Sequence, residues 1–144
     1  MGRYLKTMIL SEQNLKPEAL LRFFKSHFPE KDWFFLDMYS DEDTTHFLRA
    51  NTMGFYTVMT SVKAYPVEIH LTETDEETIS EYQAKIAKAL SEKYQIKTVI
   101  DFTHPEKPDD PFYSLQFDDG ACFLVDDSEW EDTEEFIVIE PWSI

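Results

Sequence analysis

The sequence is short of cysteine and glycine, and these two shortages exclude several kinds of functional site. Cys122 is the only cysteine among 144 residues, so the chain cannot close a disulfide within itself or build a zinc or iron-sulfur site from several thiolates. The three glycines, Gly2, Gly54 and Gly120, are too few and too widely spaced for a phosphate-binding loop or a GxSxG nucleophile elbow. Nucleotide binding through such loops is therefore excluded. The single cysteine fits a reducing compartment, so a cytoplasmic location is expected.

Long apolar runs and positive charge are also scarce. No run approaches the roughly 18 apolar residues that a membrane-spanning helix needs, and residues 8–10 are too short for the apolar core of a signal peptide. Lysine and arginine total 13 against 29 aspartates and glutamates, which gives a formal net charge of -16. Because binding to a nucleic-acid backbone depends on lysine and arginine, no nucleic acid is expected as a partner. The lack of long apolar runs means that no membrane is expected as a partner either.

The negative charge is concentrated in the last third of the chain. Residues 101–144 hold 14 of the carboxylates, and Lys107 is their only lysine or arginine. The densest stretch, residues 126–135, combines seven carboxylates with one tryptophan. Acidic groups steer a basic partner over long range, and a desolvated tryptophan supplies contact energy. The predicted partner-binding residues are Asp126, Asp127, Glu129, Trp130, Glu131, Asp132, Glu134 and Glu135.

The same stretch has a simpler interpretation. A solvated acidic loop whose Trp130 folds back onto the core is at least as common as a docking element. The other two tryptophans, Trp33 and Trp142, are expected in the core. The position of Trp130 is therefore the observation that bears on both interpretations.

Hydrophobic periodicity predicts a single α+β domain that spans residues 1–144. The clearest strand pattern is at 67–72, and the clearest helix pattern follows the capping-box residues 74–77. The first half is predicted to contain a strand at 4–10, a helix from Pro17 to Pro29 and a buried strand at 33–39. A hairpin of 46–50 with 55–62 should follow, and its turn at 51–54 is expected to hold Gly54 at positive φ. The second half is predicted to contain the strand at 67–72, a helix ending near Tyr94, a strand at 97–102, a hairpin of 112–117 with 121–125 around Asp118-Asp119-Gly120, and a last strand at 136–139.

The predicted elements follow the order β-α-β-β-β twice, with one more strand at the end. Placing residues 4–10 over 67–73 aligns the two helices and puts Gly54 on Gly120. Identity between the halves is low, and small α+β domains often alternate in this way. An internal duplication of residues 1–63 and 64–144 stays open, within a mostly antiparallel sheet that carries two helices.

A duplicated fold offers a second kind of binding site. Two curved sheets can enclose an apolar cleft between the halves, and such clefts hold small molecules. The expected lining of this cleft is aromatic and consists of Tyr39, Phe55, Tyr56, Tyr65, Phe112, Tyr113 and Phe123.

Residues suited to catalysis or metal binding are few. Cys122 lies within a predicted strand with no base nearby, which favours a buried structural thiol. The histidines have no HxH or HExxH spacing, and His70 is interpreted as a residue on the polar face of its strand. No metal and no cofactor are therefore predicted. A hydrolase that uses His70, His46 or Cys122 with nearby carboxylates is the least favoured of three alternatives.

The placement of charge and the absence of catalytic motifs favour a binding protein over an enzyme. The expected function is that of a small acidic protein that blocks the basic surface of another protein, as an immunity protein or inhibitor does. A small-molecule-binding domain is the first alternative. The sequence leaves the oligomeric state open.

Overall fold

The computed structural model describes residues 8–36, 51–72, 76–133 and 135–143 and contains one mixed sheet of eight strands with two long helices. The predicted α+β fold, with a mostly antiparallel sheet and two helices, is confirmed. In chain order the elements are β1 (Met8–Ser11), α1 (Pro17–His27), β2 (Asp32–Phe35), β3 (Thr52–Met59), β4 (Val67–Thr72), α2 (Glu76–Tyr94), β5 (Lys97–Asp101), β6 (Tyr113–Asp118), β7 (Ala121–Asp126), the short helix α3 (Trp130–Thr133) and β8 (Ile137–Pro141).

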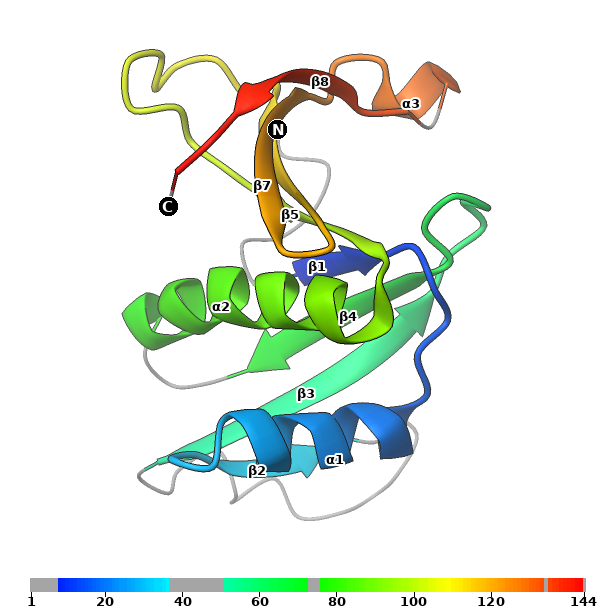
Figure 1. The fold of residues 1–144 in the computed structure, drawn as a ribbon, viewed down its shortest axis with the longest axis vertical. Helices are drawn as coiled ribbons and strands as arrows, with labels where there is room; N and C mark the ends of the chain where they lie inside the picture. Colours follow the sequence, from blue (N-terminus) through cyan, green and yellow to red (C-terminus); the bar gives the residue numbers. More distant parts are fainter. Residues whose placement is uncertain (1–7, 37–50, 73–75, 134, 144) are drawn as a thin grey trace.

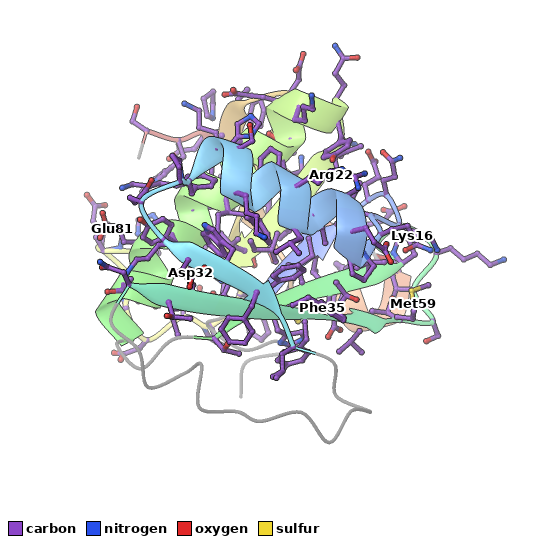
Figure 2. The ribbon with its side chains drawn as sticks, turned by 90° about the horizontal axis from the view of Figure 1, so that it is seen from below. Lys16, Arg22, Asp32, Phe35, Met59 and Glu81 are labelled. Carbon is purple, nitrogen blue, oxygen red and sulfur yellow. The ribbon has the colours of Figure 1, made fainter. Side chains whose placement is uncertain are left out.

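The strands are arranged in the order β2-β3-β4-β1-β5-β6-β7-β8, and only β2 and β3 pair in parallel. The inner strands β3-β4-β1-β5, connected through α1 and α2, form a split β-α-β arrangement with β1 inserted between β4 and β5. Strands β6, β7 and β8 extend the sheet beyond β5 as an antiparallel meander. Both long helices lie on one face of the sheet, and α1 lies over β2 and β3 (Figures 1 and 2).

Helix α1 packs an aromatic face onto the sheet. The helix begins at Pro17, whose missing N–H has no partner in a first helical turn, and it buries Phe24 against Trp33 and Phe55. The ring centroids of Phe24 lie 4.6 Å from those of Trp33 and 4.8 Å from those of Phe55. The indole N–H of Trp33 donates to the carbonyl oxygen of Phe28 at 2.7 Å, which satisfies its only polar group. Trp33 thus belongs to the core, as the sequence predicts.

Helix α2 packs beside α1 and covers the centre of the sheet. Its buried residues Ile79, Ile86 and Leu90 recur at helical spacing and join the main core cluster. Gln95, the residue after the helix, adopts a left-handed φ of 53°, and the N–H of Ile96 then donates to the carbonyl oxygen of Ser91 at 3.2 Å. The predicted helix ending near Tyr94 is confirmed.

A second, smaller cluster lies on the face of the sheet opposite the helices. Ile9 of β1 faces the helices, so its neighbours Met8 and Leu10 point to the other face. There they contact Tyr65 and Val99. Val62, Trp130 and Phe136 are partly buried against this cluster, so the acidic stretch is attached to the sheet by aromatic packing.

The turn predicted at residues 51–54 is wrong, because Thr52 to Gly54 already belong to β3. Asn51 does adopt a left-handed φ of 62°, but the chain is extended directly after it. Gly54 is required for space: a Cβ built there would lie 2.7 Å from Cζ of Phe34 and 2.8 Å from Oγ1 of Thr72. The partner predicted for this hairpin, residues 46–50, lies outside the described residues, as do 4–7 and 37–39 of the other predicted strands and 74–75 of the capping box.

The second predicted hairpin is confirmed. Strands β6 and β7 pair in register around Asp119 and Gly120, whose φ values of 48° and 85° suit a two-residue hairpin turn. Strand β8 corresponds to the predicted last strand. The internal duplication is not shown: β2 pairs directly with β3, whereas β5 and β7, the strands that the alignment of Gly54 with Gly120 places opposite them, are separated by β6. In the described ranges, no helix is both long and apolar enough to cross a bilayer.

Candidate functional site

The last third of the chain forms one end of the molecule. Strands β7 and β8, the short helix α3 and the loop after β5 gather at the end opposite α1 and β2 (Figure 1). The carboxylates that are concentrated in the sequence are therefore concentrated in space as well. Exposed carboxylates of this end are Glu106, Asp109, Glu129, Glu135 and Glu140.

These exposed carboxylates have little local compensation. The ion pairs found in the described part of the chain involve Glu68, Glu81 and Glu92, all of which precede this third. Lys107, the single lysine of the acidic end, directs its ammonium to the hydroxyl oxygen of Tyr113 at 3.2 Å. That contact raises the pKa of Lys107, so the ammonium stays charged. Negative charge thus predominates at this end, although the ammonium of Lys107 interacts with Glu106 and Asp110.

The predicted partner-binding residues differ in how they are placed. Asp127 is only 3% exposed, and one of its carboxylate oxygens accepts the hydroxyl of Ser114 at 2.7 Å. Asp126 is half-buried and accepts the backbone N–H of Ser128 at 2.8 Å. Glu129 and Glu135 are exposed. The side chains of Glu131, Asp132 and Glu134 lie outside the described residues. Asp127 therefore supports the segment from within, whereas Glu129 and Glu135 face solvent.

Trp130 packs back onto the sheet rather than standing free. Its ring is stacked on Phe136 with centroids 4.5 Å apart and meets the edge of Tyr65 at 5.6 Å. The residue is half-buried, and Glu129 before it is exposed. The segment is thus held by aromatic contacts at Trp130 and by a buried carboxylate at Asp127.

The aromatic residues predicted to line an apolar cleft are not gathered around one cavity. Phe55 is buried under α1 in the main core, whereas Tyr56, its neighbour on β3, stacks on His70 at 4.7 Å. Tyr65 belongs to the second cluster. The remaining residues are Phe112, which is exposed, Tyr113, which contacts His104, Phe123, which is half-buried on β7, and Tyr39, which lies outside the described residues.

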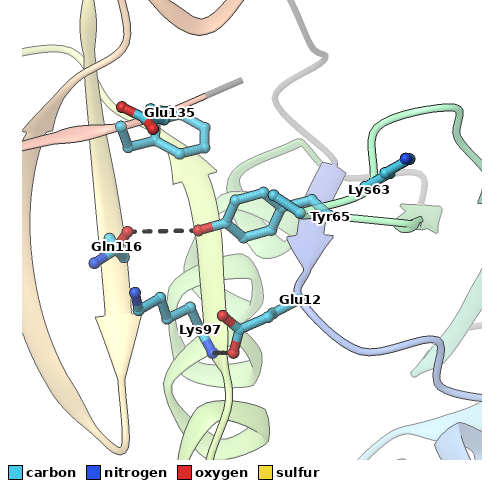
Figure 3. A pocket seen from close by; sticks show the side chains of 8 residues that line it. Glu12, Lys63, Tyr65, Lys97, Gln116 and Glu135 are labelled. Carbon is cyan, nitrogen blue, oxygen red and sulfur yellow. Dashed lines mark hydrogen bonds between the residues drawn. The ribbon is translucent and has the colours of Figure 1, made fainter. Parts of the chain in front are cut away.

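A polar pocket of about 380 Å³ lies beside Tyr65 (Figure 3). Its wall is formed by residues of five segments, with Glu12 after β1, Tyr65 before β4, Lys97 on β5, Gln116 on β6 and Glu135 before β8. Figure 3 shows Lys97 extended toward Gln116, while Lys63 points away from the pocket. Glu135 lies on the opposite side, next to Phe136. The pocket thus combines an ammonium group and two carboxylates above an aromatic floor.

Tyr65 is the most constrained residue of this pocket. Its hydroxyl donates to Oε1 of Gln116 at a long distance of 3.5 Å. Burial raises the pKa of Tyr65 well above that of an exposed tyrosine, and the charges of Glu12 and Asp118 raise it further. The phenol therefore stays protonated and serves as a hydrogen-bond donor. A second hollow, of about 350 Å³, lies between α2 and β5.

The residues considered for hydrolysis are not brought together. His70 is buried, with Nε2 3.0 Å from a carboxylate oxygen of Glu68, and it is not the surface residue that the sequence pattern predicts. Cys122 lies on β7, which is separated from β4 by three strands, or roughly 19 Å at about 4.8 Å per strand. His46 lies outside the described residues. In the described ranges, no group of three histidine, cysteine or carboxylate side chains is placed to hold a metal ion.

Comparison of the chain with protein-family models, with curated proteins and with solved structures finds no match. The site must therefore be interpreted from its own geometry.

Two features of this end were not predicted from the sequence. One is the polar pocket, whose residues lie far apart in the chain and become neighbours only through the strand order β4-β1-β5-β6. The other is the open position of β8, where three consecutive aliphatic residues are about half exposed. A run of three aliphatic residues is typical of a buried strand, so the pattern alone indicates the core.

Proposed function

We propose that the protein binds a basic protein through its acidic end, in the manner of an inhibitor or immunity protein. The observation that carries this proposal is the exposure, at one end of the molecule, of five carboxylates outside any ion pair of the described residues. Fields of one sign raise the rate at which an oppositely charged partner associates, and they disfavour other partners.

The half-buried position of Trp130 fits this proposal in a modified form. Contact energy at interfaces comes from side chains held in place before binding, because a rigid side chain loses little entropy. Trp130 is held by Phe136 and Tyr65, and it directly follows the exposed Glu129 in the chain. The contact surface then consists of Glu129, Trp130, Glu135 and Glu140, with Asp127 as an internal support.

The test compares two variants that carry the same change in net charge. The first variant replaces Glu129, Glu135 and Glu140 with glutamine, and the second replaces Glu18, Glu81 and Glu92, which are exposed on the two helices. Basic proteins captured from a native lysate at low salt should be lost with the first variant and retained with the second. Equal capture by both variants, or no basic protein captured by the unchanged chain at low salt, contradicts the proposal.

A second candidate function is binding of a small polar molecule, and the pocket beside Tyr65 favours it. Lys97 extends its ammonium toward Gln116, the carboxylate of Glu12 accepts the backbone N–H of Lys97 at 3.1 Å, and Glu135 lines the same pocket. A zwitterion suits this lining, because its amino group can bind a carboxylate and its acid group can bind Lys97. This location replaces the aromatic cleft between duplicated halves, which rests on a duplication that the pairing of strands does not support.

Thermal-shift measurements with free amino acids test this candidate. A ligand at a hundred times its Kd adds about 2.7 kcal/mol to the free energy of unfolding. Lys97→Met should abolish the shift, whereas Lys93→Met, an exposed lysine of α2, should leave it unchanged. A flat screen over amino acids removes this candidate and leaves the first proposal intact.

A further inference from the structure

Strand β8 forms one border of the sheet and is open to solvent. Its inner side pairs with β7, and no strand of the described residues pairs with its outer side. Ile137, Val138 and Ile139 are 49%, 51% and 48% exposed. The outer edge of a strand presents unpaired N–H and C=O groups, which bind another extended chain.

The exposure of three consecutive residues shows that neither face of β8 is covered. Successive side chains of a strand point to opposite faces, so one covered face would leave only alternate residues exposed. Other residues of the sheet do show such coverage: Val125 on the neighbouring strand β7 is fully buried. The apolar surface therefore wraps around the edge, and an added strand can pack side chains on both faces.

The open stretch is short. A β-bulge interrupts the pairing of β8 with β7 between Leu124 and Val125, and Pro141 has no N–H to offer at the end of the strand. Bulges and prolines limit strand addition at natural sheet edges. The open stretch thus suits a short extended segment better than a long continuous sheet.

Charge decides what kind of segment fits. An antiparallel pairing of two β8 strands centred on Val138 would bring Glu135 of one copy next to Glu140 of the other. Like charges at neighbouring positions of paired strands are destabilising, and each copy carries a net charge of -16. A segment that alternates aliphatic and basic residues instead places its cations beside these carboxylates and its aliphatic side chains on Ile137 to Ile139.

We propose that β8 accepts an extended, basic segment of a partner protein as a ninth strand of the sheet. This inference rests on the proposed binding of a basic protein and specifies how that partner is held. Backbone hydrogen bonds to β8 supply affinity, alternate aliphatic side chains supply packing, and lysine or arginine side chains meet Glu135 and Glu140.

Three short peptides of equal length separate strand addition from attraction of charge. The first peptide alternates valine with lysine, the second has the same sequence with N-methyl groups along one edge, and the third carries glutamate in place of lysine. The first peptide should bind, as measured by fluorescence anisotropy, and protect backbone amides of β8 from hydrogen exchange. N-methylation should weaken binding about tenfold or more, which corresponds to about 1.4 kcal/mol. The acidic peptide should not bind.

Two variants of the protein locate the binding. Val138→Lys places a charge on the open edge, and Met59→Lys makes the same change in charge at the 63% exposed Met59 on β3. Both residues are exposed, so both variants should fold, which circular dichroism verifies. Val138→Lys should weaken binding of the valine-lysine peptide about tenfold or more, and Met59→Lys should change it less than twofold.

The outcomes distinguish strand addition at β8 from the more general proposal that the acidic end binds a basic protein. Equal affinity of the plain and N-methylated peptides overturns strand addition and leaves binding of basic partners in place. Failure of every basic peptide at low salt contradicts both. Self-association of the chain in sedimentation, lost in Val138→Lys, would assign the edge to a second copy and would also overturn the inference.

Discussion

The hydroxyl of Ser114 on β6 donates a hydrogen bond of 2.7 Å to Oδ2 of Asp127, and both residues are buried. The contact joins the acidic segment to the sheet from inside. The N–H of Asp127 also donates to the carbonyl oxygen of Phe112 at 2.9 Å, so its backbone and side chain are both held. One of the seven carboxylates of this segment therefore serves the fold rather than a partner.

Removing the hydroxyl of Ser114 should destabilise the fold, because the buried carboxylate of Asp127 then loses a hydrogen bond. Ser114→Ala deprives Asp127 of its hydroxyl partner, and we expect the free energy of unfolding to fall by about 1–3 kcal/mol. Urea denaturation measures the change. Asp119→Ala, at the exposed hairpin turn, is not a suitable control because its backbone has a positive φ. Glu129→Ala removes an exposed carboxylate of the same segment and should change stability by less than about 0.5 kcal/mol.

The stacking of Trp130 predicts a cost in stability for its removal. Trp130→Ala eliminates the contacts with Phe136 and Tyr65, and we expect a loss of about 1–3 kcal/mol, less than for a fully buried tryptophan. Trp130→Phe retains an aromatic ring and should therefore keep most of the stability that Trp130→Ala loses. An alanine variant as stable as the unchanged protein would show that the ring does not hold the segment.

Gly54 should not tolerate a side chain. In Gly54→Ala the new Cβ meets the ring of Phe34 at 2.7 Å and Oγ1 of Thr72 at 2.8 Å, and overpacking of this kind costs about 1–3 kcal/mol. Phe34→Leu should relieve part of the cost in the double variant, because it removes the atom in closest contact. Additive effects of the two changes in a double-mutant cycle would contradict this explanation.

Cys122 should react slowly. Burial raises the pKa of its thiol, and the positive charge of Lys88 offsets only part of that shift. At a pH near 8 the folded protein should therefore be alkylated more slowly than the urea-unfolded chain. Lys88→Gln should slow the folded protein further, whereas Lys85→Gln, which removes an exposed lysine on the same helix, should not.

Tyr65 should make stability depend on alkaline pH. Its pKa is raised in the folded state, mainly by burial, so folding favours the protonated phenol. This contribution is complete below the unfolded value of about 10 and is lost as pH rises above it. Tyr65→Phe should therefore flatten the fall in the free energy of unfolding above pH of about 10, measured by urea denaturation. An unchanged slope would show that Tyr65 ionises freely in the fold.

The sequence predicts the helices and strands better than it predicts which of them lie side by side. Apolar spacing identifies α2 and β4 because it arises from local geometry, and the pair Asp119-Gly120 identifies the β6–β7 turn because both residues accept positive φ. Asn51 does adopt the positive φ that is typical of a turn, but it is a single residue before β3 and not part of a four-residue turn. Gly54 is then explained by Phe34 and Thr72, which no local pattern connects to it.

The acidic segment shows a similar limit. In sequence Asp127 resembles Asp126 and Glu129, yet burial and a hydrogen bond from Ser114, 13 residues away, give it a different role. His70 occupies a polar position in an alternating strand, but Tyr56 on the next strand covers it. Both results depend on which strands are adjacent, and composition carries little information on strand order.

The central place of β1 also bears on how the chain is assembled during synthesis. Met8 to Ser11 pair with β4 on one side and β5 on the other, so the first described strand finds its neighbours only after residues 67–101 have been made. Pairing between such distant segments slows folding, and an unpaired strand is prone to aggregation until its neighbours arrive. A nascent chain halted before β5 would leave the middle of the sheet incomplete on one side.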